Sequence, residues 1–450
     1  MSNFILLPQR PQSSLRIIKL IQPASVFSVL YVANLSSPLI AITPIDVSGG
    51  KNSWTVATKL LLRYPDGSSE IRSEELWQSP TFGGRAFEFK VGKQPDFVFP
   101  NYQDYGYGIF LLDDKSRDYV LKNIQNEKDP FLRSMMWGAL WDSVREAELD
   151  PREYVELAIR QLGGTGQKPA RSKGTRNIDQ SLETDETIIQ SLLGRVGTAM
   201  NYYLPDAQRN AIAPRLESVL LDRLQHAPTA GQRITFYRAF VTTASTAKGR
   251  EVLKEMLAQG SPSGQRPAAA VSAGSRHSDV PLRTKDRFDI VTRLIILDDP
   301  DAPKQLAQLE KTETGDDAKR YAYAARAGIA TAENKAKYWS DFTANKDISE
   351  SWIEAAFGPF NSVRHSDLTL PYLERALAEL PNHKRTRKIF FVNGWLGAFI
   401  GGQKSEAALA VVNKFLSDNP TLDRDLRLKI LENVDLIERA VKIRKKFSHE

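Results

Sequence analysis

A change of hydrophobic period near residue 112 is the feature that most constrains how this 450-residue chain folds. Before it, apolar residues alternate with their neighbours from Trp54 to Tyr64, which is typical of a half-buried strand. Asp66-Gly67 then supplies a tight-turn signal. After Asp113, apolar residues recur at helical spacing to the end of the chain. The sequence therefore predicts a short β region followed by a long helical region.

The β region is predicted to form a small antiparallel β-sandwich over residues 51–112, because short strands between turn signals favour two packed sheets. Residues 1–50 are partly strand-forming and receive no assignment. Residues 113–450 are predicted to form an irregular α-helical superhelix of paired antiparallel helices, HEAT- or armadillo-like, since no strict repeat period is present. The chain is thus expected to be mainly α.

Helix boundary signals support this organisation. Asp150 is predicted to cap a helix that starts at Pro151 and ends at Gly163-Gly164. Two polar, glycine-rich stretches, 163–183 and 260–286, are expected to be flexible loops within the helical array. Examples of the later expected helices are residues 287–297, 302–311, 316–330, 333–343, 371–380, 386–400, 405–417 and 423–446.

Two scarce residue types exclude several kinds of chemistry. The chain has no cysteine, which excludes disulfides, thiolate zinc sites, iron–sulfur clusters and cysteine nucleophiles. None of its five histidines has a second histidine four residues away, so the zinc-binding pattern His-Glu-x-x-His is absent. We therefore expect no catalytic residue and no metal ligand in this chain.

The charge balance is weakly basic, with 61 Lys and Arg against 54 Asp and Glu. A solvated surface of mixed charge accounts for this excess better than nucleic acid binding does, so no nucleic acid partner is expected. No run of about 18 apolar residues predicts a membrane span. The apolar stretch Leu20–Ile42 is interrupted by Pro23 and Pro38, so we expect a soluble protein without a signal peptide.

The densest basic cluster in the sequence is a candidate for peptide contact. Arg385, Arg387 and Lys388 stand beside the apolar run 389–392. Arginine offers a planar fork that suits a peptide's terminal carboxylate, so these three residues could line a basic concave wall. The competing interpretation is that they solvate the end of a helix.

Several segments together resemble the C-terminal half of aminopeptidase N-like zinc metallopeptidases of the M1 family. The resemblance covers about residues 52–450 and rests on nine short segments, of which the fourth is followed by Arg145: Phe99–Asn101, Asp104–Tyr107, Leu111–Asp113, Trp137–Asp142, Asp286–Arg293, Leu370–Arg375, Arg387–Phe391, Ala398–Gln403 and Asp425–Lys429.

The resemblance implies a β-sandwich followed by a helical bowl that encloses a catalytic cleft and helps to select peptides. The family's catalytic domain, with His-Glu-x-x-His, the distal glutamate and the Gly-x-Met-Glu-Asn loop, is not represented. Gly197–Asn201 has a slight likeness to that loop but lacks its glutamate, so we interpret it as chance.

We therefore expect the chain alone to be inactive, with zinc bound only in a separate or missing catalytic domain. Its expected partners are that catalytic domain, in a longer or split protein, or peptides. The alternative is a free-standing helical-repeat scaffold that binds a peptide or protein partner.

Overall fold

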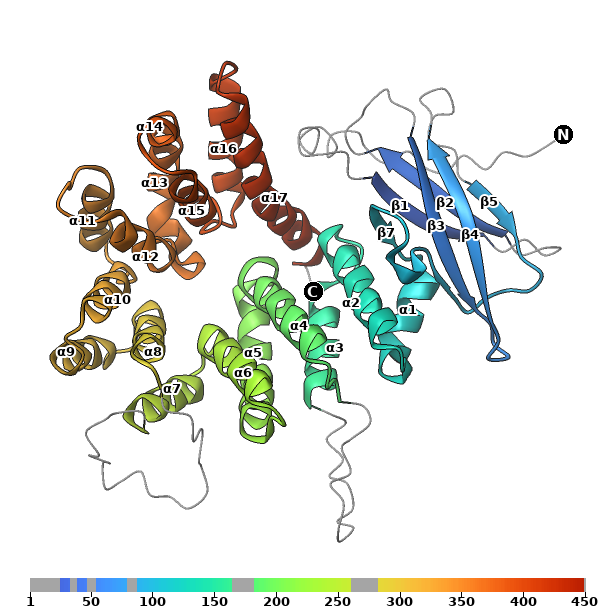
Figure 1. The fold of residues 1–450 in the computed structure, drawn as a ribbon, viewed down its shortest axis with the longest axis horizontal. Coiled ribbons are helices and arrows are strands. Elements are labelled where there is room, and N and C mark those ends of the chain that lie inside the picture. Colours follow the sequence, from blue (N-terminus) through green and yellow to red (C-terminus); the bar gives the residue numbers. More distant parts are fainter. Residues whose placement is uncertain are drawn as a thin grey trace, which may run out of the picture. The chain divides into compact units, whose positions relative to one another are not determined.

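The structure, a computed structural model, describes residues 25–32, 39–46, 54–78, 87–163, 182–259 and 282–448. It divides into two compact units, residues 1–143 and 144–450. The first contains the strands and the second is entirely helical in its described part (Figure 1). The predicted fold class, mainly α with a small preceding β region, is confirmed.

Seven described strands form two facing sheets in the first unit. The first sheet has the order β5-β2-β1-β7 and the second has the order β4-β3-β6. Their bounds are β1 Ser25–Val32, β2 Leu39–Asp46, β3 Trp54–Arg63, β4 Ser69–Gln78, β5 Phe87–Lys90, β6 Phe97–Phe99 and β7 Ile109–Leu111.

Alternating side chains from both sheets fill the core of this sandwich. Ile40 and Ile42 of β2 pack with Leu60 and Leu62 of β3, and all four are fully buried. The turn predicted at Asp66-Gly67 joins β3 to β4, and Gly67 adopts a φ of 80°, which favours glycine.

The sandwich differs from the prediction in two ways. It begins before residue 51, because β1 and β2 pair with each other and supply the centre of the first sheet. It is also not wholly antiparallel, since β7 returns to pair parallel with β1.

Helices begin directly after β7, as the change of period predicted. α1 (Asp114–Asn123) is capped by Asp113, whose carboxylate accepts a hydrogen bond from the Ser116 backbone nitrogen at 3.0 Å. α1 packs on β6 within the first unit. α2 (Pro130–Arg145) follows and crosses the boundary between the two units.

The second unit is a superhelix of helices in two layers. In one layer, α6, α8, α10, α12, α15 and α17 follow one another, each packed on the next. Their partners α9, α11, α13 and α16 pack against them from the other layer. The bounds are α3 Pro151–Gly163, α4 Glu186–Thr198, α5 Asp206–His226, α6 Ala230–Thr243, α7 Ala247–Gln259, α8 Thr284–Ile296, α9 Ala302–Thr312, α10 Asp316–Ala327, α11 Ala332–Thr343, α12 Glu350–Phe360, α13 Ser366–Ala378, α14 Leu380–Thr386, α15 Ile389–Phe399, α16 Glu406–Asp418 and α17 Arg424–Phe447.

Most boundaries agree with the expected helices, but α13 begins at Ser366, five residues before its expected start. α3 starts at Pro151 and ends at Gly163, as predicted, and the Asp150 carboxylate accepts from the Arg152 backbone nitrogen at 2.7 Å. α12, which contains Pro359, and α14 were not among the helices expected from the sequence. α8 starts at Thr284, three residues before the expected helix. Of the two expected loops, residues 164–181 and 260–281 lie outside the described residues.

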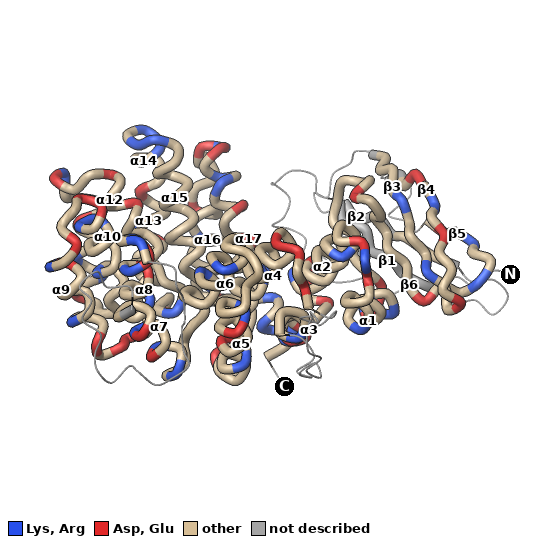
Figure 2. Tube along the Cα trace, turned by 60° about the horizontal axis from the view of Figure 1, so that its bottom comes forward, with Lys and Arg blue, Asp and Glu red and all other residues tan. Residues whose placement is uncertain are grey.

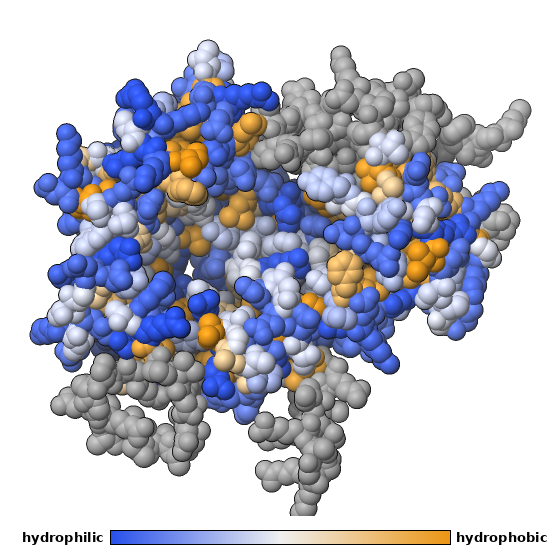
Figure 3. All heavy atoms as spheres, viewed as in Figure 1, coloured by the Kyte–Doolittle hydropathy of each residue, from blue (hydrophilic) through white to orange (hydrophobic). Residues whose placement is uncertain are grey.

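The last helix returns to the start of the second unit and closes the superhelix. Arg439 of α17 donates to the Glu146 carboxylate at 2.6 Å and to the Arg145 carbonyl at 3.1 Å. Lys446 Nζ donates to the Ala147 carbonyl at 2.7 Å. These contacts anchor both ends of the helical array, so the helices surround a central hollow, which Figure 3 shows from one face.

Aromatic side chains hold the two layers together around α15. The Trp395 ring lies 4.4 Å from the Phe399 ring and 5.5 Å from the Phe357 ring, centroid to centroid. Its indole nitrogen donates to the Ala376 carbonyl at 2.9 Å, so this buried polar group is satisfied. Helix α15 is thereby fixed against α12 and α13.

Candidate functional site

A short segment that departs from α-helical geometry lies beside the hollow of the second unit. After α4, residues Ala199–Tyr203 form a π-helical turn, η6, of a type often found at functional positions. η6 contacts α17 and the short helix η7 (Val363–His365), so it lies where the start and the end of the superhelix meet. The Tyr202 hydroxyl donates to the Gly401 carbonyl at 2.6 Å and holds the turn in place.

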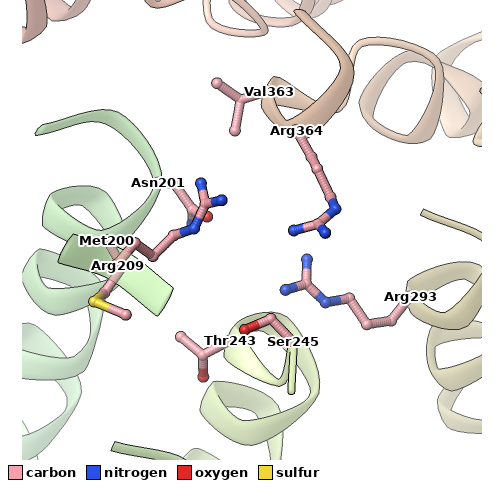
Figure 4. A pocket seen from close by; sticks show the side chains of 8 residues that line it. All are labelled: Met200, Asn201, Arg209, Thr243, Ser245, Arg293, Val363 and Arg364. Carbon is pink, nitrogen blue, oxygen red and sulfur yellow. The ribbon is translucent and has the colours of Figure 1, made fainter. Parts of the chain in front are cut away.

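A small pocket, with a cavity volume of about 20 Å³, opens to solvent beside this turn. Five segments contribute to it: η6, α5, the end of α6 with the turn after it, α8 and η7 (Figure 4). Its lining residues are Met200, Asn201, Arg209, Thr243, Ser245, Arg293, Val363 and Arg364.

Three arginines dominate this pocket, which we call the arginine pocket. Arg293 on α8 and Arg364 on η7 direct their guanidinium groups toward one another, and Arg209 on α5 faces them from the opposite side (Figure 4). Arg293 Nε donates to the Ala244 carbonyl at 3.0 Å, which fixes its orientation and leaves its outer nitrogens facing the pocket.

Two carboxylates near the pocket already have partners. Glu217 accepts hydrogen bonds from the Ser245 and Thr246 backbone nitrogens at 2.7 and 3.0 Å, where it caps the start of α7. Asp206 pairs with Arg209 at 3.1 Å. Within the described part of the chain, neither Arg293 nor Arg364 has a carboxylate oxygen within 4 Å.

The pKa values of Arg293 and Arg364 are both lowered, mainly by burial, although Glu217 opposes the shift at Arg293 and Asp298 and Asp206 oppose it at Arg364. Burial lowers the pKa of Arg293, and the neighbouring charges of Arg364 and Arg209 lower it further. Burial also lowers the pKa of Arg364, again with a contribution from Arg209. Cations that are partly desolvated and repel one another favour a bound anion, which would restore the balance. The arrangement is suited to a carboxylate.

The residues expected to contact peptides lie elsewhere. Arg385 belongs to α14 and donates to the Asn382 side chain at 3.1 Å, whereas Lys388 precedes α15 and is exposed. Arg387 lies 3.4 Å from the Glu350 carboxylate and its guanidinium carbon 5.0 Å from the centre of the Phe391 ring. Figure 2 shows basic residues gathered at α14. None of the three lines the arginine pocket, and their role in peptide contact stays a prediction.

Sequence reasoning missed the arginines of the pocket. Arg293 closes the segment Asp286–Arg293, which contributed to the family resemblance, and that is the only signal that could have drawn attention to it. Met200 and Asn201, set aside as a chance likeness, line the pocket. They lie in no metal site there, because no three His, Asp or Glu side chains of the described residues converge as a metal site requires.

No helix in the described ranges has both the length and the apolar composition needed to cross a bilayer.

Comparisons with known proteins agree with this architecture. The family model described as "ERAP1-like C-terminal domain" matches residues 97–439, which is more than half of the chain. The protein named Aminopeptidase N from Streptomyces lividans is 24% identical over 360 residues. That match covers 78% of this chain but 38% of the relative, so the chain spans less than half the relative's length. The chain belongs to the family of ERAP1-like C-terminal domains, the C-terminal part of M1 aminopeptidase-like proteins.

Proposed function

We propose that this chain forms the helical bowl of an aminopeptidase and selects peptides by binding their C-terminal carboxylate in the arginine pocket. The observation that carries the proposal is the pair Arg293 and Arg364, which face one another without a carboxylate partner in the described structure. Two guanidinium groups can together bind both oxygens of one carboxylate.

In this proposal the chain cleaves no bond itself. The residues described include no metal-ligand cluster, and the His-Glu-x-x-His pattern is absent from the sequence. Zinc and the catalytic residues would be supplied by a catalytic domain, either in the same longer protein or in a separate chain. The bowl would hold the far end of the peptide while that domain acts on its N-terminus.

The test compares short synthetic peptides that carry a fluorescent label at the N-terminus and end in either a free or an amidated C-terminus. Fluorescence anisotropy measures their Kd for the full chain. A charge-assisted contact of about 1.5–3 kcal/mol predicts at least tenfold tighter binding of the free acid. The preference should shrink at high ionic strength, since salt screens the attraction.

Two sets of substitutions locate the site. Arg293→Gln with Arg364→Gln should remove the preference for the free acid. A matched set, Arg385→Gln with Arg387→Gln and Lys388→Gln, should leave it intact. If the second set removes the preference instead, the site lies at α14 as the sequence predicted. Equal Kd values for free and amidated peptides in the parent chain would refute the proposed function.

The free-standing scaffold remains the second candidate, and the same pocket would serve it. Both functions use the same peptide ligand, but only the first requires association with a catalytic domain. A catalytic aminopeptidase domain added in trans should bind the full chain, measured by analytical ultracentrifugation, if the first proposal holds. Peptide binding without any such association would favour the scaffold.

A further inference from the structure

The two facing arginines of the arginine pocket belong to segments that are far apart in the sequence. Arg293 lies in the last turn of α8, whereas Arg364 lies in η7. The side chain of His365 connects the two segments, because its ring Nε2 lies 2.8 Å from the carbonyl oxygen of Ile296 at the end of α8. A carbonyl oxygen can only accept, so Nε2 carries the hydrogen and donates.

The way in which α8 ends leaves the Ile296 carbonyl available to η7. Asp298, just beyond the helix, adopts a left-handed φ of 54°, and its backbone nitrogen donates to the Ile295 carbonyl at 3.0 Å. The next backbone nitrogen donates to the Leu294 carbonyl, also at 3.0 Å. This is a common way to end a helix, and it satisfies two of the last carbonyls from within the same segment. The carbonyl of Ile296 instead accepts from His365, so η7 is joined to the last turn of α8.

The surroundings of His365 favour this hydrogen bond. Its side chain is 13% exposed, so little water competes for the Ile296 carbonyl, and the Asp298 carboxylate lies 3.7 Å from the same ring nitrogen. The backbone nitrogen of His365 donates to the Ser362 carbonyl at 2.9 Å, which closes the turn that carries the ring. Arg364 is the preceding residue in that turn, so its backbone is fixed relative to α8.

Such a link matters because the two arginines repel one another. The guanidinium groups of Arg293 and Arg364 point toward each other (Figure 4), and their like charges favour a wider spacing, at which one carboxylate could not reach both. We propose that His365 is a positioning residue of the arginine pocket, whose bond to α8 sets the spacing at which Arg293 and Arg364 bind one carboxylate. The inference rests on the proposed function. His365 is not among the described residues that line the pocket, so it acts through Arg364 rather than on the ligand.

The test compares two amide side chains that differ in reach. His365→Gln places a donor near the position of Nε2 and can still reach the Ile296 carbonyl, whereas His365→Asn is one methylene shorter and cannot. Anisotropy gives the Kd of the free-acid and amidated peptides for each full-chain variant. We expect His365→Gln to keep a free-acid preference of about tenfold and His365→Asn to lower it to about threefold or less, by weakening only the free acid. The matched control is His226→Asn on α5, which removes an exposed histidine bonded within its own helix and should leave the preference unchanged.

A double-mutant comparison shows whether His365 acts through Arg364. In an Arg364→Gln background, His365→Asn should cause no further loss of the free-acid preference, because the side chain that it positions is already absent. An equal further loss in that background, a preference that survives His365→Asn in the parent, or a preference that His365→Gln fails to keep would overturn the inference. The melting temperature of each variant shows that it is folded. In these three cases the parent still prefers the free acid and the proposed function stands, whereas equal Kd values in the parent would overturn both.

Discussion

The contacts by which α17 closes the superhelix should stabilise the fold, and the size of this effect can be predicted from one ion pair. Glu146 and Arg439 lie 2.6 Å apart, and their side chains are 18% and 12% exposed. A charge-assisted hydrogen bond of this kind contributes about 1.5–3 kcal/mol. Lys442, at 3.3 Å, is 47% exposed and adds little. Arg439 keeps Asp435 at 2.7 Å in the variant, so we expect Glu146→Gln to cost about 2 kcal/mol.

The stability difference between the parent and Glu146→Gln should also depend on pH, in a direction that the pKa of Glu146 determines. Burial alone would raise the pKa of Glu146, but the charges of Arg439 and Lys442 outweigh burial and lower it. A carboxylate with a lowered pKa stabilises the fold above its unfolded pKa, and this stabilisation is lost as the pH falls through the folded pKa. The parent and Glu146→Gln should therefore differ at pH 7 and converge in acid.

Urea unfolding followed by far-UV circular dichroism measures the difference, because the signal comes mainly from the helices. Hydrogen exchange should also speed up locally, at residues 144–147 and along α17. Glu432→Gln on the exposed face of α17 is the matched control and should leave the free energy of unfolding unchanged. Equal stability of parent and Glu146→Gln at pH 7, or a difference that persists unchanged in acid, would refute the reasoning.

Four further predictions follow from individual groups. Burial lowers the pKa of His383 to about 4; the chain should therefore lose stability as the pH falls from about 6.5 to 4, by about 3 kcal/mol, and His383→Leu should remove this loss in acid unfolding curves. Lys335 is buried with its Nζ 2.8 Å from the Ala327 and Phe360 carbonyls, and burial lowers its pKa to about 8; because the unfolded chain holds that proton more tightly, the parent should gain stability over Lys335→Met between about pH 8 and 10.5. Arg364→Gln should raise the melting temperature at low ionic strength, and less so in high salt, since repulsion from Arg209 and Arg293 is relieved and only partly offset by the lost attraction to Asp298 and Asp206. Metal analysis of the purified, dialysed chain should find no stoichiometric zinc, and one zinc per chain would contradict the expectation that metal belongs to another domain.

Local patterns predicted most of the elements because the forces that define them are local. Asp150 followed by Pro151 satisfies the first free backbone nitrogens of a helix, whatever the rest of the chain does. The strands β1 and β2 lie within residues that received no assignment. Part of this segment was weighed as a leader, and pairing with β5 and β7, farther along the chain, shows that both strands belong to the sandwich.

The arginine pocket could not be predicted in the same way. Arg293 and Arg364 are single cations on separate helices, and each looks like an ordinary solvated residue until the superhelix brings them together. Arg385, Arg387 and Lys388 attracted attention because they are neighbours in sequence. In the structure, Arg387 is engaged by Glu350 and by the Phe391 ring, which are contacts that stabilise the end of a helix.

Arg293 and Arg364 differ from cations such as Arg439 in whether a carboxylate or an aromatic ring lies beside the charge. Where a cation serves the fold, a carboxylate or an aromatic ring accompanies it, as Glu146 accompanies Arg439 in the closure of the superhelix. Arg293 and Arg364 instead face each other at the edge of a hollow, partly desolvated, while Glu217 nearby is committed to capping α7. Such an arrangement lowers the stability of the empty protein, and a bound anion would recover that loss as binding free energy. The argument for a binding site rests on this uncompensated charge more than on the shape of the pocket.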